Sequence, residues 1–264
     1  MKLYLDPGHG GTDPGASGYG LKEKDVVLDI AFRIRDILTG DYKNVSIRMS
    51  RTNDSNQTLR QRTDEANAWG ADYYLSIHCN AFNGAADGYE DFIHNSLSVN
   101  SQTLMYQDIL HEEITKVNQL RNRGQKKANF HVLRETAMPS FLSENGFIDH
   151  PGDASLMKQN TWKQRVAEGH VNGLARAFNL KRRGNDTGSG NLYKVIAGSF
   201  KSKENADDRV SFLGSKGIDA FVDNVNISGV RWYRVQAGAF TNREHTENHL
   251  RTVKNTGVDA YIIQ

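Results

Sequence analysis

The chain has 264 residues, a formal net charge of +2 and one cysteine. This length accommodates one large domain with a substantial core and a small second domain. The balanced charge gives no case for nucleic acid or an anionic membrane surface, a single cysteine excludes an internal disulfide framework, and no apolar run approaches the roughly 20 residues of a membrane helix. Met1 and Lys2 run directly into the first predicted strand, which predicts synthesis in the cytoplasm without a signal peptide.

A glycine-rich turn follows this first strand, Leu3–Leu5. Gly8, Gly10 and Gly11 surround His9. Because glycine tolerates backbone angles that other residues avoid, the turn can hold the imidazole out from the tip of the strand. A phosphate-binding loop is the weaker interpretation, because no Lys-Ser or Lys-Thr follows the glycines.

Glu23 opens a predicted helix whose apolar side chains recur at helical spacing. In a strand–loop–helix unit the helix begins near the carboxyl end of the preceding strand, where open α/β sheets place their sites. Glu23 can therefore return to the neighbourhood of His9. A solvated first-turn glutamate is the alternative.

The third candidate, His78, stands at the carboxyl end of a predicted central strand, residues 71–80. This is the sheet edge to which His9 and Glu23 are assigned. Strand alternation points His78 and Asn80 to one face and Cys79 to the other, which predicts that Cys79 is a buried structural thiol.

The rest of the first domain is predicted as strands at 45–49, 88–93, 130–133 and 140–142 and helices at 58–69, 101–117 and 153–178. We expect Met105 to face inward from the helix at 101–117 and His170 to be a packed core histidine in the helix at 153–178. Alternating strands and helices with short connections predict an α/β domain over residues 1–180, with a mostly parallel sheet flanked by helices.

Residues 181–191 contain no core-forming side chains and are predicted to be a flexible linker. Beyond them the sequence repeats with a period of 40 residues, so that 193–200 aligns with 233–240. Each repeat is predicted to be strand–helix–strand. Residues 192–264 are therefore expected to form a small α+β domain, βαββαβ, of ferredoxin-like shape.

His9, Glu23 and His78 together suggest a metal site. Two imidazoles and a carboxylate suit a catalytic zinc ion whose fourth position stays open. Hydrolysis of an amide also needs a general base. Glu144 is the candidate, because it ends an apolar strand where desolvation raises the pKa of a carboxyl group. Glu135 competes for this role.

Several separated motifs occur in one order along residues 1–180: DPGHGGTDPGA, KEKDVVLDIA, SRTND, LSIHCNA and HVLRETAMPSFLSENGFI. Their order and spacing resemble the zinc-dependent N-acetylmuramoyl-L-alanine amidases. The resemblance implies one zinc ion held by His9, Glu23 and His78, with Glu144 as the catalytic glutamate. It also implies cleavage of the peptidoglycan amide between N-acetylmuramic acid and L-alanine.

Three further residues, Asn80, Arg51 and Arg134, lie in motif positions of this resemblance. They are candidates for substrate contacts, and structural roles are the alternative.

The second domain resembles a tandem-repeat SPOR-type domain, which implies binding to the glycan strand of peptidoglycan. Tyr233, Gln236 and Phe240 match its YxVQxGAF pattern, whereas the first repeat has Ile196 in the place of Gln236. These aromatic residues could instead be core. Nucleic-acid binding on the sheet is discounted, because this domain contains ten Lys and Arg and eight acidic residues, which is too small an excess of positive charge to bind phosphates.

The sequence therefore predicts a two-domain peptidoglycan hydrolase of the autolysin or endolysin kind. It would act on the cell wall after release from the cytoplasm, at mother-cell lysis in sporulation or at phage release. The alternatives are a zinc carboxypeptidase that trims stem peptides and a non-catalytic wall-binding protein.

Overall fold

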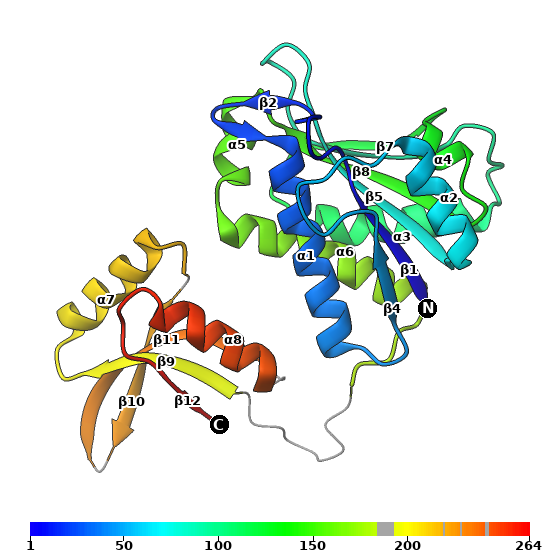
Figure 1. Cartoon of the computed structure of the whole chain (residues 1–264). Coiled ribbons are helices and arrows are strands. Elements are labelled where there is room, and N and C mark those ends of the chain that lie inside the picture. Colours follow the sequence, from blue (N-terminus) through cyan, green and yellow to red (C-terminus); the bar gives the residue numbers. More distant parts are fainter. Residues whose placement is uncertain (184–192, 219, 228, 241–242) are drawn as a thin grey trace. The chain divides into compact units, whose positions relative to one another are not determined.

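The structure is a computed structural model that describes residues 1–183, 193–218, 220–227, 229–240 and 243–264 (Figure 1). The chain divides into two compact units, Met1–Arg182 and Arg183–Gln264. Most of the predicted linker, residues 181–191, lies outside the described residues.

The larger unit is built on a six-stranded sheet with the strand order β4-β1-β5-β8-β6-β7. The strands are β1 (Lys2–Pro7), β4 (Ser46–Met49), β5 (Tyr73–Asn80), β6 (Tyr89–His94), β7 (Asn122–Ala128) and β8 (Ser140–Phe147). The first four strands in the sheet order are parallel, whereas β6 runs antiparallel to β8 and parallel to β7. The sheet is thus mostly parallel, as predicted. A short hairpin, β2 (Ser17–Gly18) and β3 (Leu21–Lys22), precedes the first helix.

Helices cover both faces of this sheet (Figure 1). They are α1 (Glu23–Asp41), α2 (Leu59–Trp69), α3 (Gln102–Thr115), α4 (His131–Arg134), α5 (Pro151–Met157) and α6 (Asn160–Ala177). One buried cluster joins α1, α3, α5 and α6 to the face that carries Leu3 and Leu5. A second joins α2 and α4 to the opposite face, which carries Tyr4 and Tyr74.

Local sequence explains which face of α1 is buried and where α2 begins and ends. Ile30 and Ile34 of α1 are fully buried, as the helical spacing of the apolar residues predicts. Thr58 and Gln61 form a reciprocal capping box at the start of α2. Gly70 ends the same helix in the left-handed conformation, with φ of 65°, which glycine adopts without a Cβ clash.

Four details of this unit differ from the prediction. Residues 131–134 form α4, which packs against α2, and not a strand. Strand β7 is absent from the prediction, because its sequence NRGQKKA is polar. The helix predicted over 153–178 is two helices, α5 and α6, and Met105 is 58% exposed rather than inward.

Cys79 and His170 are both buried, as predicted. The two nitrogens of His170 lie 2.7 Å from the carbonyl oxygen of Val166 and 3.0 Å from Ser143 Oγ. Burial lowers the pKa of His170 to about 4, against the opposing backbone hydrogen bond. His170 is therefore a neutral core residue.

The smaller unit is a four-stranded antiparallel sheet, in the order β10-β11-β9-β12, with two helices. Its elements are β9 (Tyr193–Phe200), α7 (Lys203–Ser215), β10 (Phe221–Ile227), β11 (Val230–Phe240), α8 (Arg243–Lys254) and β12 (Tyr261–Ile263). The first strands of the two repeats, β9 and β11, pair side by side. This arrangement confirms the predicted βαββαβ domain. No helix among the described parts of the chain is long and apolar enough to cross a membrane.

Candidate metal centre

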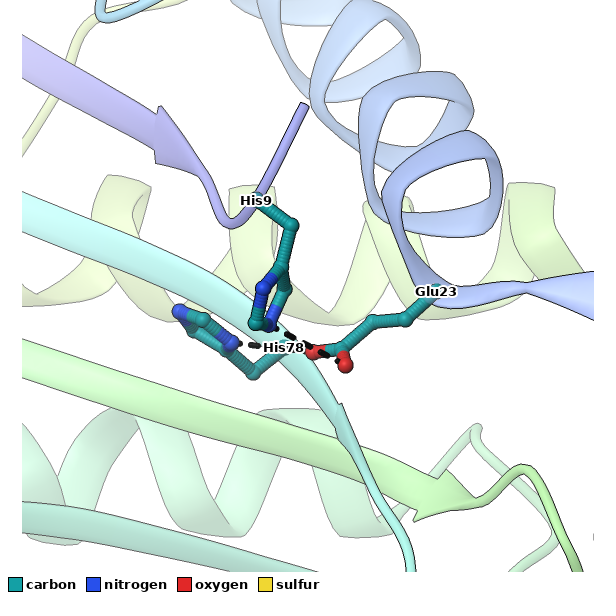
Figure 2. A group of neighbouring side chains, drawn as sticks. All are labelled: His9, Glu23 and His78. Carbon is teal, nitrogen blue, oxygen red and sulfur yellow. Dashed lines mark hydrogen bonds and ion pairs between the residues drawn. The ribbon is translucent and has the colours of Figure 1, made fainter. Parts of the chain in front are cut away.

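His9, Glu23 and His78 meet in space although they come from three different elements (Figure 2). His9 follows β1, Glu23 is the first residue of α1, and His78 lies in β5. One ligand atom from each lies within 4.8 Å of the others. Nε2 of His9 is 3.1 Å from Glu23 Oε2, and Nδ1 of His78 is 2.9 Å from Glu23 Oε1.

Glu23 is buried and held at both oxygens. Oε1 accepts the backbone N–H of Cys79 at 2.9 Å, and Oε2 accepts that of Ala16 at 2.8 Å. Burial acts to raise the pKa of Glu23, but the hydrogen bonds of His78 and His9 outweigh it and hold the pKa well below its usual range. The carboxylate is therefore fixed and ionised.

His9 is held by its other ring nitrogen. Its Nδ1 lies 2.8 Å from Asp13 Oδ2, which leaves Nε2 directed at Glu23. Burial acts to lower the pKa of His9, yet the hydrogen bonds and charges of Glu23 and Asp13 raise it above its ordinary value. A carboxylate on the second ring nitrogen is the usual way in which a metal-binding histidine is oriented.

Two glycines allow the side chains of His78 and Glu23 to approach the backbone closely. A Cβ at Gly8 would lie 2.2 Å from Cε1 of His78. A Cβ at Gly15, where φ is +64°, would lie 2.5 Å from Oε2 of Glu23. Side chains at these positions would displace His78 and Glu23, so the glycine-rich turn is needed for close approach as well as for its backbone angles.

Two buried arginines fasten the turn that carries His9. Arg62 donates to the carbonyl oxygen of His9 at 2.7 Å and pairs with the buried Asp6 at 2.6 Å. Arg51 donates to the carbonyl oxygen of Gly8 at 2.8 Å and is itself 3% exposed. The guanidinium of Arg51 is thus directed at the backbone, as the structural alternative expects.

Replacing Arg62 by methionine is expected to destabilise the protein by about 3–5 kcal/mol, because Asp6 would be left as a buried charge without its partner. Urea unfolding measures this loss. The matched control in the same helix is Arg60→Met, which removes an exposed i,i+4 pair with Asp64 and should leave the unfolding midpoint unchanged. Equal midpoints for both variants would show that the buried pair contributes little.

Glu144 lies next to the three residues, on the neighbouring strand. It is the register partner of His78 across β5 and β8, so both side chains stand on one face of the sheet. Its Oε2 is buried and has no hydrogen-bond partner among the described residues. Burial raises the pKa of Glu144 well above its usual value, and the charges of Glu23 and Glu90 raise it further.

Asn80 and Glu135 lie in different surroundings. Asn80 donates through Nδ2 to Glu90 at 2.9 Å and accepts the N–H of Ala81 through Oδ1. Glu135 is about half exposed and pairs with Arg134 at 2.7 Å. The hydrogen bond from Arg134 lowers the pKa of Glu135 below its ordinary value and outweighs the opposing effect of burial.

Arg134 lies away from the three-residue cluster. The carbonyl oxygen of its neighbour Leu133 accepts the hydroxyl of Ser140, which begins β8. Glu144 lies four residues further along that strand, a rise of about 13 Å. The structure therefore does not bring Arg134 together with the cluster.

The three residues predicted to contact glycan in the second domain are buried or half-buried. Gln236 is 7% exposed and pairs in register with Ile196. Tyr233 and Phe240 are half-buried and contact the apolar core of the smaller unit. The alternative that these aromatic residues serve the core is consistent with this placement.

The donor set fits a divalent metal ion. Two ring nitrogens and one carboxylate oxygen are typical of catalytic zinc sites with three protein ligands, and two of the three side chains, His9 and Glu23, are oriented by groups outside the cluster. Sequence reasoning missed Asp13, Asp6 and Arg62. For Asp13 a signal existed, because it is a carboxylate four residues after His9 in the same turn.

Replacing Asp13 by asparagine is expected to weaken metal binding by about 10–100-fold, because His9 would lose the carboxylate that orients its ring. Competition with a zinc-binding dye measures the affinity. Asp36→Asn, which removes an exposed pair with Arg35, is the control and should bind as tightly as the wild type. An unchanged affinity in Asp13→Asn would contradict this role.

The fold and the site together define an α/β domain with a candidate catalytic metal site, joined to a small second domain. Comparison with known families agrees with this class. The N-acetylmuramoyl-L-alanine amidase family matches residues 3–176, and the SPOR domain family matches residues 189–264. The chain belongs to the N-acetylmuramoyl-L-alanine amidase family. This confirms the prediction of a peptidoglycan amidase with a SPOR domain.

Individual relatives match most of the chain. It is 50% identical over 222 residues to the N-acetylmuramoyl-L-alanine amidase CwlM of Bacillus licheniformis, which covers 84% of each chain. It is 38% identical over 211 residues to the endolysin of Bacillus phage SPP1, covering 78% of this chain and 77% of the phage protein. A solved N-acetylmuramoyl-L-alanine amidase from Clostridium difficile 630 matches with a TM-score of 0.64 and 31% identity, covering 67% of this chain and 96% of the other.

Proposed function

We propose that His9, Glu23 and His78 hold one zinc ion and that Glu144 is the general base in cleavage of the muramoyl–L-alanine amide. The observation that carries this proposal is the position of Glu144. Glu144 lies on β8, directly beside His78 of β5. Its Oε2 is buried and has no hydrogen-bond partner among the described residues. The described residues therefore leave the acceptor capacity of this oxygen unused.

The chain's own residues divide the work of amide hydrolysis. A zinc ion in this site would supply Lewis-acid polarisation of a carbonyl oxygen and a lowered pKa for water. Glu144 takes a proton from the attacking water and passes it to the leaving nitrogen of L-alanine. Burial raises the pKa of Glu144, which is the direction needed in a carboxyl group that both accepts and returns a proton. Asp13 keeps His9 in place throughout, and the backbone N–H groups of Ala16 and Cys79, which donate to the Glu23 carboxylate, keep Glu23 in place.

We further propose that residues 1–180 form the catalytic domain, 181–191 a linker, and 192–264 a peptidoglycan-binding domain that retains the enzyme on the wall. Tethering of this kind raises the local concentration of the catalytic domain at its substrate. Glycan contacts by Tyr233, Gln236 and Phe240 remain a prediction.

The physiological setting that we propose is the wall of a lysing cell. The chain is 49% identical over 222 residues to the sporulation-specific N-acetylmuramoyl-L-alanine amidase of Bacillus subtilis, and less similar to the phage endolysin. We therefore favour mother-cell lysis in sporulation. Detection of the protein in the medium before any lysis would contradict this setting.

The test is product analysis on purified cell walls. An amidase releases intact stem peptides with a new amino group on L-alanine, together with loss of turbidity. A carboxypeptidase would release single amino acids, and a wall-binding protein would release nothing. Removal of the metal by a chelator should stop the reaction, and one zinc ion per chain should restore it.

A further inference from the structure

A second group of polar residues stands beside Glu144, on the two strands beyond it. Glu90 of β6 is the register partner of Glu144, and Lys126 of β7 is the register partner of Phe92. Phe92 contacts the same buried cluster as Tyr74 of β5. By strand alternation, Glu90 and Lys126 therefore stand on the face that carries Glu144.

Glu90 accepts hydrogen bonds from the other members of this group. Its Oε2 accepts Nε of Arg123 at 2.6 Å and Nζ of Lys126 at 2.5 Å, and its Oε1 accepts Nδ2 of Asn80 at 2.9 Å. The side chain of Glu90 is 5% exposed, whereas those of Arg123 and Lys126 are 24% and 38% exposed. The anion is thus buried and the two cations reach the surface.

The charges of this group do not balance. Two cations share one carboxylate, which leaves one positive charge. Burial acts to raise the pKa of Glu90, but the hydrogen bonds of Lys126 and Arg123 outweigh it and keep Glu90 ionised. Within the described ranges, Lys126 Nζ has no acceptor besides Glu90, and Nη2 of Arg123 has none. Both cations therefore have donors left for a ligand.

The chemistry of the substrate identifies the ligand. The carboxyl group of the muramic acid is consumed in the scissile amide, and N-acetylated sugars are neutral. Carboxylates of the substrate thus lie on its peptide side. Two strand spacings separate Glu144 from β7, about 10 Å. An extended peptide advances about 3.3–3.6 Å per residue, so this distance corresponds to two or three residues.

We propose that Arg123 and Lys126 bind a carboxylate of the stem peptide at the second or third residue from the scissile amide. Glu90 is a positioning residue, which holds the two cations at the edge of the sheet. This inference rests on the proposed function, because the reaction at Glu144 fixes where the peptide begins. It assigns the β6–β7 edge to the peptide and predicts selectivity for walls whose peptides keep that carboxylate free.

The test compares synthetic muramoyl tripeptides that differ only in a carboxylate or a carboxamide at the second residue, at the third residue, or at both. For the wild type, kcat/KM should fall about tenfold when the recognised carboxylate becomes an amide, as expected for a lost charge-assisted hydrogen bond. Lys126→Gln and Arg123→Gln should each bring this ratio towards one. The control is Lys127→Gln, whose side chain donates to the carbonyl oxygen of Leu97 and which should keep the wild-type ratio.

The ratio of two substrates is measured on one preparation, so a partly folded variant does not imitate the expected result. Equal rates of the wild type on all peptides, or an unchanged ratio in both variants, would overturn the carboxylate site and leave the proposed function intact. Failure of the wild type to cleave any of the peptides at the L-alanine amide would instead overturn the proposed function, and this inference with it.

Discussion

Replacing Glu144 by glutamine is expected to abolish the clearing of purified cell walls while leaving the zinc content unchanged. Glutamine keeps the shape of the side chain but cannot accept the proton of the attacking water. Loss of a general base lowers the rate by about 10²–10⁴-fold. The metal should stay, because Glu144 is not one of the three clustered residues. Turbidity loss and zinc content, measured on the same preparation, separate the two roles.

Glu135→Gln is the control for this experiment. Glu135 is exposed and paired with Arg134, so its replacement should leave clearing unchanged. Clearing by Glu144→Gln at the wild-type rate would show that Glu144 is not the base. Loss of both clearing and zinc in Glu144→Gln would show that the side chain holds the metal site together.

Replacing Gly8 by alanine is expected to remove the metal and the activity together. The new methyl group would lie 2.2 Å from Cε1, 2.5 Å from Nε2 and 2.7 Å from Nδ1 of His78. The imidazole must therefore move. Zinc–nitrogen bonds of about 2.0–2.1 Å do not tolerate such a shift. We expect zinc affinity to fall by at least about 100-fold, measured by competition with a chelating dye.

Gly20→Ala gives the opposite pattern and serves as its control. Gly20 has φ of +81°, which alanine adopts with strain, but a Cβ there has no neighbour within 4 Å. This variant should lose stability, by about 1 kcal/mol, and keep its zinc. Full zinc content and wild-type clearing in Gly8→Ala would mean that the backbone moves to accommodate the methyl group.

The place of the candidate metal site could be predicted from the sequence because fold topology determines it. His9 and His78 end parallel strands and Glu23 begins the helix after the first of them, so one sheet edge must gather all three. Strand alternation then separates Cys79 from His78. These arguments need only the period of a strand and the direction of the chain.

The supporting residues could not be predicted in the same way. Asp6 and Arg62 are 56 residues apart, and their pairing depends on how α2 packs on the sheet. β7 is an edge strand whose Arg and Lys side chains serve Glu90 and solvent, so it lacks the apolar alternation of a buried strand. The aromatic and branched residues of 130–133 favour a strand locally, and packing against α2 overrides that preference.

The backbone at His9 has φ of +60°, in a region that costs energy for any residue with a side chain. The groups that impose this conformation, Arg62 and Arg51, bond to carbonyl oxygens of the turn and not to the ligand atoms. The hydrogen bonds that form when the domain folds therefore offset the free-energy cost of the His9 conformation. The turn then needs no rearrangement when it binds an ion. A metal-binding site that is preorganised in this way should exchange one divalent ion for another while the domain stays folded, unlike domains whose folding depends on the metal itself.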